Sequence, residues 1–508
     1  MLSNAQTEKY LSAVVLAAFT LVGCENGMDD NGNGNEGDGI TIRLSVFPES
    51  ITVDYEIQKT FVTVTTNAPE WDFVSTVSWV DATRNGEDIN LIIAQNNSAN
   101  TREGEIIIFT TSGSQRIEKR VSIVQYSKDE SEVGNEDDFE CPVFESLMLS
   151  NCDFNGDGRI SESEAARVTE INVAYTESDA ENREHITSLK GIKKFKNLQY
   201  LYCENNLIKS LDLSGMEKLE FVDCYYNEMV SLNVSNCPSL KWVYCYSNNI
   251  SELNISGSNN LIILQAYKNN LKSIDVSGLK ELVHFDVRMN ELREVNFSNC
   301  PKLTVAAVGG NKLISLNLEG LPSLYTLGCY ENNIASLDVS KLAKLEMLEC
   351  YTNNIATLDL SANTELTTLT CQQNMLTSLN IDNCKKLTKI DCHNNFLEGE
   401  ADFSSFTALK KLYCGGNRYT SIGVNGCLLL EELSCENTQI TALEVSSLSA
   451  LVSLIANDCL ISKMDCSNNL KLGTLYLQGN PLTELVLADG QRIADLKLDN
   501  HDVISYKK

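Results

Sequence analysis

The sequence predicts a mainly β protein in which a β-sandwich is followed by a short helical cap and by a solenoid with a parallel sheet. Three observations lead to this prediction. Positions 40–126 contain short runs of alternating apolar and polar residues, a twelve-residue acidic loop lies at 153–164, and one pattern recurs every 21 residues from Leu198 onwards.

The composition excludes some classes of protein. The 508 residues include 69 acids and 40 bases, which gives a formal charge of −29. Phosphate groups would repel such a chain, so we expect no nucleic-acid partner. Hydrophobic residues make up 43% of the sequence, which is enough for a real core, and the four histidines leave little room for a histidine-built metal centre.

The first residues predict export and attachment to a membrane. Residues 11–23 form an apolar stretch that is too short to span a bilayer but has the length of a signal-peptide core. The stretch ends in Leu21-Val22-Gly23-Cys24, which resembles the lipobox of bacterial lipoproteins. The resemblance implies a signal peptide at 1–23 and an acylated Cys24. The alternative is an ordinary secretory signal in which Cys24 has no role.

A tether at 24–39 follows and is rich in Gly, Asn and Asp. Its early acids resemble the surface-export signals of Bacteroidota lipoproteins. We therefore expect an outer-membrane lipoprotein at the cell surface, held to the membrane by its lipid alone.

Residues 40–126 predict a small β module. Six β-rich runs are separated by turn signals such as Asn85-Gly86, and this number of short strands indicates an immunoglobulin-like sandwich. The segment resembles the BACON family at Trp71, Ser78-Trp79, Asn96-Asn97, the 100–104 stretch and Val124-Gln125. The resemblance implies carbohydrate binding, with Trp71 and Trp79 stacked on a sugar ring. The alternative is that both tryptophans are core residues and the module is a spacer.

An acidic linker at 127–141 leads to a loop that resembles the calcium loop of EF-hand proteins. The expected ligands are Asp153, Asn155, Asp157, Arg159 (through its carbonyl), Ser161 (through a water) and Glu164. The loop predicts Ca²⁺ binding within a helical cap at 142–168. Since no second loop follows, we expect a structural role for the ion. The alternative is a decayed loop kept for its shape.

Fourteen repeats of the unit L-x-x-L-x-C-x-x-N-x-L-x-x-L-D-L-S follow, with one 22-residue step between Leu387 and Leu409. The pattern resembles the leucine-rich repeat family, which implies a solenoid over 169–490 with a concave parallel sheet. The leucines are expected to point inward, and the asparagine to satisfy backbone groups at the turn. Thr438 and Cys459 replace this asparagine in two repeats, and residues 491–508 are expected to form a C-terminal cap.

Most of the eighteen cysteines recur in the repeat, nine of them at one inward position. A disulfide framework would not repeat every 21 residues, so we expect mostly free, buried thiols. A solenoid with such a ladder resembles the cysteine-ladder members of the bacterial internalins, which also begin with a helical cap. The lipid anchor, the BACON-like module and the missing cell-wall sorting tail are departures, so receptor binding for invasion is not carried over.

The outward strand positions of the first repeats predict a binding face, because exposed tyrosine and tryptophan give a large contact area at low entropy cost. The candidate residues are Tyr200, Tyr202, Phe221, Tyr225, Trp242, Tyr244, Tyr246 and Tyr267, edged by Glu204, Asp223 and Lys241. The alternative is that tyrosine simply suits an exposed strand.

These observations favour a monomeric, non-enzymatic surface lipoprotein that binds a protein or a glycan through the concave face. Neither a G-x-S-x-G nor an H-E-x-x-H motif occurs. Two alternatives remain: a structural spacer or adhesin scaffold, and carbohydrate binding through the BACON-like module.

Overall fold

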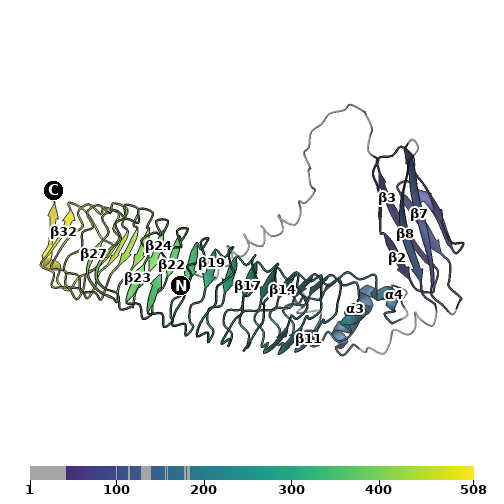
Figure 1. Ribbon diagram of the computed structural model, residues 1–508, viewed down its shortest axis with the longest axis horizontal. Helices are drawn as coiled ribbons and strands as arrows, with labels where there is room; N and C mark the ends of the chain where they lie inside the picture. Colours follow the sequence, from purple (N-terminus) through teal and green to yellow (C-terminus); the bar gives the residue numbers. More distant parts are fainter. Residues whose placement is uncertain are drawn as a thin grey trace.

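The computed structural model describes residues 42–98, 100–112, 115–127, 139–154, 156, 158–176, 179 and 183–507. These residues form two β structures and a short helical segment (Figure 1). The first β structure has two four-stranded sheets, and the second is a solenoid built on a sixteen-stranded sheet. The prediction of a mainly β chain with a parallel-strand solenoid is confirmed.

The N-terminal β structure is a sandwich around one apolar core. One sheet has the order β1-β3-β6-β5 and the other the order β2-β8-β7-β4. Val62 and Val64 of β3 are buried in this core, while their strand neighbours are more exposed. The strands are β1 Leu44–Phe47, β2 Ser50–Val53, β3 Gln58–Thr66, β4 Asp72–Ser75, β5 Val80–Asn85, β6 Asp88–Ile93, β7 Arg102–Ser112 and β8 Gln115–Gln125.

Among the described residues, two helices precede the solenoid and share its core. Helix α3 covers Pro142–Cys152, and α4 covers Glu162–Ala165. Pro142 lies at the start of α3, where the missing N–H has no intrahelical partner to lose. The buried side chains Phe144 and Met148 of α3 belong to the same apolar cluster as Leu198 of the first repeat. The helical segment therefore covers the N-terminal end of the solenoid core.

The solenoid sheet is parallel, and its strands follow one another in chain order. Fourteen strands belong to the recurring repeats, one precedes them and one follows them. From β9 to β31 the middle residue of each strand is apolar and buried. The strands are β9 Glu170–Asn172, β10 Tyr200–Tyr202, β12 Phe221–Asp223, β14 Trp242–Tyr244, β16 Ile263–Gln265, β17 His284–Asp286, β18 Val305–Ala307, β19 Thr326–Gly328, β20 Met347–Glu349, β22 Thr368–Thr370, β24 Lys389–Asp391, β26 Lys411–Tyr413, β28 Glu432–Ser434, β29 Ser453–Ile455, β31 Thr474–Tyr476 and β33 Asp495–Lys497.

Shorter parallel ladders and, in the part of the chain that the structure describes, two single-turn 3₁₀ helices complete the turns of the solenoid. The ladders are β11 Ser210–Asp212, β13 Ser231–Asn233 and β15 Glu252–Asn254; β21 Thr357–Asp359 and β23 Ser378–Asn380; β25 Glu398–Asp402 and β27 Arg418–Gly423; and β30 Lys463–Asp465, β32 Glu484–Ala488 and β34 Ile504–Lys507. The 3₁₀ helices are η2 Ile192–Lys194 and η3 His501–Val503.

The asparagine of the repeat ties neighbouring turns together. The side chain of Asn227 donates to the carbonyls of Cys203 and Cys224 at 3.0 and 3.1 Å, and it accepts from the backbone N–H of Ile208 at 3.0 Å. The same contacts recur from Asn248 to Asn417 along the solenoid. Each asparagine thus satisfies backbone groups of two repeats, as the sequence predicts.

All seventeen cysteines from Cys141 onwards are buried free thiols. The nine that follow the strands form a continuous inward row with apolar residues such as Ala266 and Val287 in the intervening repeats. A second set of cysteines recurs at another position of the repeat, at Cys237, Cys300, Cys384 and Cys427. These thiols point at backbone carbonyls of the preceding repeat, as Cys237 does at the carbonyl of Leu213 (3.1 Å). The prediction of free, buried thiols agrees with this arrangement.

Candidate ligand-binding face

The outward side chains of the sixteen-stranded sheet and the residues just after its strands form one face of the solenoid, called here the strand face. On the first four repeats this face carries two groups of aromatic rings. Tyr202, Phe221 and Tyr244 form the first group, with ring centroids 4.9 and 5.6 Å apart. The register pairs Tyr200 with Phe221 and Phe221 with Trp242 on neighbouring strands, so all five side chains lie on the same face.

The second group is a stack of tyrosines. Tyr225, Tyr246 and Tyr267 follow three successive strands, and their rings stack face to face at 4.5 and 4.4 Å. The exposed ring of Tyr226 meets the edge of this stack. The structure therefore brings the eight predicted aromatic residues together on one surface, here called the aromatic patch. All eight remain partly exposed.

Charged and acidic side chains lie at the edge of the aromatic patch and between its rings. Lys241 donates to Glu220 at 2.8 Å, and its amine lies 5.5 Å from the ring centroid of Trp242. Asp223 lies between Tyr202 and Tyr244 in the register of the sheet. Burial, with a contribution from Glu204, raises the pKa of Asp223 to about 8, and burial also raises the pKa of Glu204.

Further along the strand face, Asp286 forms an ion pair with Arg288. Arg288 donates from Nε and Nη2 to the two carboxylate oxygens at 2.9 and 2.6 Å. The guanidinium also lies 5.4 Å from the ring centroid of Tyr267. A second tyrosine stack, Tyr330 on Tyr351 at 4.6 Å, follows this pair. These contacts follow the aromatic patch along the strand face.

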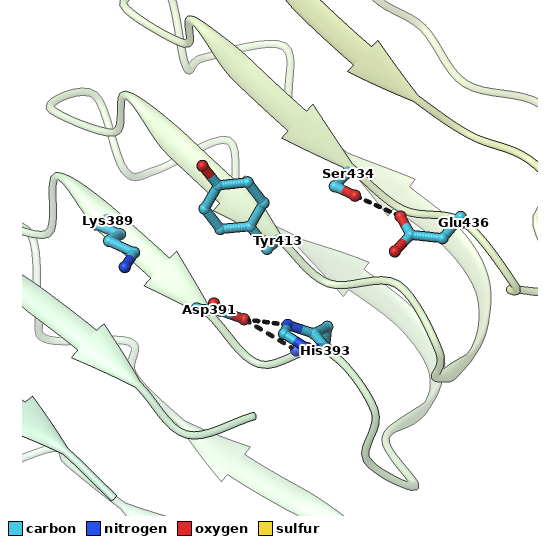
Figure 2. Close-up of a pocket in the computed structure, with 6 residues that line it drawn as sticks. All are labelled: Lys389, Asp391, His393, Tyr413, Ser434 and Glu436. Atoms are coloured by element: carbon cyan, nitrogen blue, oxygen red, sulfur yellow. Dashed lines mark hydrogen bonds and ion pairs between the residues drawn. The ribbon is translucent and has the colours of Figure 1, made fainter. Parts of the chain in front are cut away.

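A polar hollow of about 280 Å³ lies over β24, β26 and β28 (Figure 2). His393 contacts Asp391 at 2.5 Å, and this hydrogen bond raises the pKa of His393. Ser434 donates its hydroxyl proton to Glu436 rather than to the imidazole, so these groups are not arranged as a nucleophile and its base. The hollow is lined by Lys389, Asp391, His393, Tyr413, Ser434 and Glu436.

Reasoning from the sequence did not find this hollow or the Asp286–Arg288 pair. Both leave a signal in the repeat alignment. Arg288 and His393 are basic residues at the position that carries tyrosine elsewhere, two residues after an aspartate. Gly415 is a residue without a side chain in the same row, and a Cβ there would lie 2.6 Å from the carboxyl carbon of Glu436.

The loop between α3 and α4 holds two of the predicted calcium ligands in a defined geometry. Asp153 accepts from the backbone N–H groups of Gly156 and Gly158 at 2.7 and 2.8 Å. Glu164 is 1% exposed and accepts from the N–H groups of Phe154 and Ser161, both at 2.8 Å. Both carboxylates therefore turn into the loop.

The remaining predicted ligands are placed less completely. Ser161 is buried and caps α4 in a capping box with Glu164, and Arg159 is exposed. Asn155 and Asp157 lie outside the described residues. Among the residues that are described, no group of three or more His, Cys, Asp or Glu side chains is arranged to hold a metal ion.

The two tryptophans of the sandwich pack against its core. Trp71 is 7% exposed, and the guanidinium of Arg84 lies 3.8 Å from its ring centroid. Trp79 is partly buried against the same core, with Arg102 at 4.4 Å from its ring. The buried Asn96 and Gln125 of the BACON-like pattern bind backbone carbonyls around this point. Trp71 in particular lacks the open ring face that stacking on a sugar requires, and it matches the alternative of a core residue.

Cys24 lies outside the described residues. In the part of the chain that the structure describes, none of the helices has the length and apolar character needed to cross a membrane.

Comparison with known proteins gives structural relatives of the solenoid. No protein-family model and no curated protein matches the sequence. The functional domain of InlJ from Listeria monocytogenes, described as including a cysteine ladder, aligns with a TM-score of 0.58 and 28% identity over 68% of this chain and 70% of that chain. YopM from Yersinia pestis, a leucine-rich effector protein, aligns with a TM-score of 0.53 and 22% identity over 70% of this chain and 98% of that one. YopM from Yersinia enterocolitica gives 0.51 and 19%, over 71% and 80%.

The two YopM structures support the fold alone, whereas the InlJ domain shares both the fold and a cysteine ladder. The C-terminal part of this chain is therefore a parallel-strand solenoid similar to those of leucine-rich repeat proteins, and the InlJ domain, an internalin, is the neighbour that also carries a cysteine ladder.

Proposed function

We propose that this protein is a non-enzymatic binding protein that recognises a protein ligand through the strand face of its solenoid. One observation carries the proposal: eight aromatic side chains from the first four repeats lie together, partly exposed, on that face. An aromatic surface of this kind supplies the rigid, desolvated contacts that dominate protein interfaces. The leucine-rich repeat neighbours support a scaffold of this type.

The proposal can be tested by probing the immobilised protein with a random-peptide display library and with a glycan array. The patch variant replaces Trp242 and Tyr246 by Ala. The matched control replaces Tyr330 and Tyr351, which form a similar stack elsewhere on the strand face. Peptides that bind the wild type and the control but not the patch variant would support a protein ligand. A glycan with this binding profile would support a glycan ligand instead. If neither a peptide nor a glycan shows this profile, a binding role for the patch is contradicted.

We also propose that Ca²⁺ stabilises the helical cap. The supporting observation is that Asp153 and Glu164 each direct their carboxylate toward the backbone of the same loop. This loop is where the oxygen ligands of a hard cation are expected. In this role Asp153, Asn155, Asp157 and Glu164 would hold the ion with their side chains, Arg159 with its carbonyl and Ser161 through a water. The ion would supply positive charge that offsets the acids and would hold the end of the core closed.

We further propose that Cys24 is acylated and that its lipid holds this binding protein on the outer membrane, facing outward. This part of the proposal depends on the lipobox-like sequence at 21–24. Metabolic labelling with an alkyne fatty acid tests it, because a Cys24→Ser variant should lose the label. The sandwich at 40–126 is then a spacer between the lipid and the solenoid, consistent with its buried Trp71.

A further inference from the structure

Three aspartates occupy the third position of a strand in the sixteen-stranded sheet: Asp223 on β12, Asp286 on β17 and Asp391 on β24. The register of the repeat makes these positions equivalent. In each case the residue two places further along the chain lies on the strand face beside the carboxylate. The three repeats therefore show what an acid at this site binds when different side chains follow it.

In two of the three repeats the chain supplies a basic side chain beside the aspartate. Arg288 grips Asp286 with two hydrogen bonds and lies near the ring of Tyr267. His393 contacts Asp391 at 2.5 Å, as Figure 2 shows. Both aspartates are buried, at 1% and 7% exposure, so each pair offsets the cost of removing a carboxylate from water.

The third repeat carries Tyr225 where the others have a base. Asp223 Oδ1 and the neighbouring Glu204 Oε2 are buried atoms with no hydrogen-bond partner among the described residues. Burial raises the pKa of both carboxyl groups, and no cationic side chain of the described residues acts on either of them to lower it. Glu349, the other acid at this strand position, differs because Arg288 and Lys389 act on it. Asp223 and Glu204 thus form an acidic floor with which no basic side chain of the described residues pairs.

Aromatic rings stand on both sides of this floor. Tyr202 and Tyr244 flank Asp223 on the neighbouring strands, and Tyr225 begins the tyrosine stack. A guanidinium suits such surroundings, because its planar fork binds carboxylate oxygens while its face stacks on an aromatic ring. The Asp286–Arg288–Tyr267 arrangement displays this combination within the same molecule.

We propose that Asp223 and Glu204, at the floor of the aromatic patch, bind the guanidinium of an arginine that a protein partner presents. The inference rests on the proposed function and specifies the chemical group that the protein ligand presents to this site. The arginine takes the place beside Asp223 that Arg288 occupies beside Asp286, three repeats further along the solenoid. The strongly acidic chain, with a formal charge of −29, favours the approach of a basic partner.

The test uses the purified protein and two small probes, N-acetylarginine amide and N-acetylcitrulline amide, titrated by calorimetry at millimolar concentration and matched ionic strength. Citrulline has nearly the same shape as arginine but no charge. The arginine probe should bind saturably and the citrulline probe should not. Asp223→Asn should weaken arginine binding by about tenfold or more, which is the usual effect of losing a charge-assisted bidentate contact.

Asp338→Asn is the matched control, because it removes the same charge from an exposed turn whose hydrogen bond to Ser340 an asparagine can keep. This variant should bind the probe as the wild type does. Tyr225→Arg supplies a guanidinium from within the chain, as Arg288 does beside Asp286, and should block the probe. Equal binding of both probes, or unchanged binding by Asp223→Asn, would overturn the inference.

The peptide selection separates this inference from the proposed function. Peptides that need Trp242 and Tyr246, are enriched in arginine and lose affinity for Asp223→Asn support both. Peptides that need the two aromatics but carry no arginine and ignore the Asp223 substitution leave the strand face as a binding surface and refute the arginine site.

Discussion

Arg288 pairs with a buried carboxylate: its guanidinium donates to both carboxylate oxygens of Asp286, a residue only 1% exposed. The two side chains leave the same strand end, two residues apart. The contact therefore needs no neighbouring repeat, and it shows how this solenoid accommodates an acid on its crowded strand face.

Replacing Arg288 by Met should destabilise the solenoid by about 3 kcal/mol, because a buried carboxylate loses its partner. Thermal unfolding followed by circular dichroism measures the effect. The double variant Asp286→Asn with Arg288→Met removes both charges and should recover most of the loss. Equal destabilisation of the single and the double variant would mean that the lost packing of Arg288, rather than its charge, is responsible.

Asp223 should make the protein less stable as the pH rises. Its folded-state pKa of about 8 lies above the unfolded value of about 3.8. The native state therefore holds the proton more tightly, and the stability that this gives is complete below pH 4 and is lost as the pH rises to 8. Because Asp223 keeps some contact with solvent, we expect an effect on the order of 1–2 kcal/mol.

Melting temperatures of the wild type and of Asp223→Asn between pH 4 and pH 8 test this expectation. The variant should melt at a higher temperature than the wild type at pH 8, and the two should converge toward pH 4. Parallel curves across the range would show that Asp223 is ionised in the native state without cost.

The solenoid could be predicted from the sequence because each of its rules is local. The spacing of Leu198 and Leu201 fixes the strand, and the recurring asparagine and cysteine fix the turn and the core. The aromatic patch followed from the same register, since side chains at equivalent positions lie side by side on neighbouring strands.

What the sequence could not decide depends on contacts between residues far apart in the chain. Trp71 could be a sugar platform or a core residue, and only its packing under Arg84 in the sandwich favours the core. The acidic floor at Asp223 could not be recognised either, because acids are common in this chain and the local sequence pattern does not show which carboxylates are buried. A side chain at Gly415 would collide with Glu436, which lines the polar hollow, and this close approach appears only when the repeats are stacked.

The asparagine of a central repeat should contribute far more to the unfolding free energy than the asparagine that follows it in the chain. Asn332 donates to the carbonyls of Val308, Cys329 and Tyr330 at 3.0–3.1 Å and accepts from the N–H of Leu313 at 2.9 Å. Asn332→Ala leaves these buried backbone groups unpaired and should cost about 2–4 kcal/mol.

Asn333→Ala is the matched control, since Asn333 is the next residue and its side chain is exposed. It should change the unfolding free energy by less than about 0.5 kcal/mol. Urea denaturation of the two variants gives the comparison. Similar midpoints for both would contradict a structural role of the asparagine row.

The calcium proposal predicts a thermal shift that depends on two residues at opposite ends of one loop. The wild type should melt at a higher temperature in excess Ca²⁺ than in chelator, because an ion that binds the folded cap alone stabilises it by mass action. Asp153→Asn with Glu164→Gln should abolish this difference, since each carboxylate faces the loop interior.

The variant also removes hydrogen bonds that hold the loop without any ion, so a lower melting temperature by itself proves little. The decisive quantity is the difference between melts with and without Ca²⁺. Asp179, whose carboxylate binds Thr176 and Arg183 outside the loop, offers a control. Asp179→Asn should lower stability through its own lost contacts yet keep the full Ca²⁺-dependent shift in melting temperature. A wild type that melts at the same temperature in calcium and in chelator would contradict the proposal that the cap binds Ca²⁺.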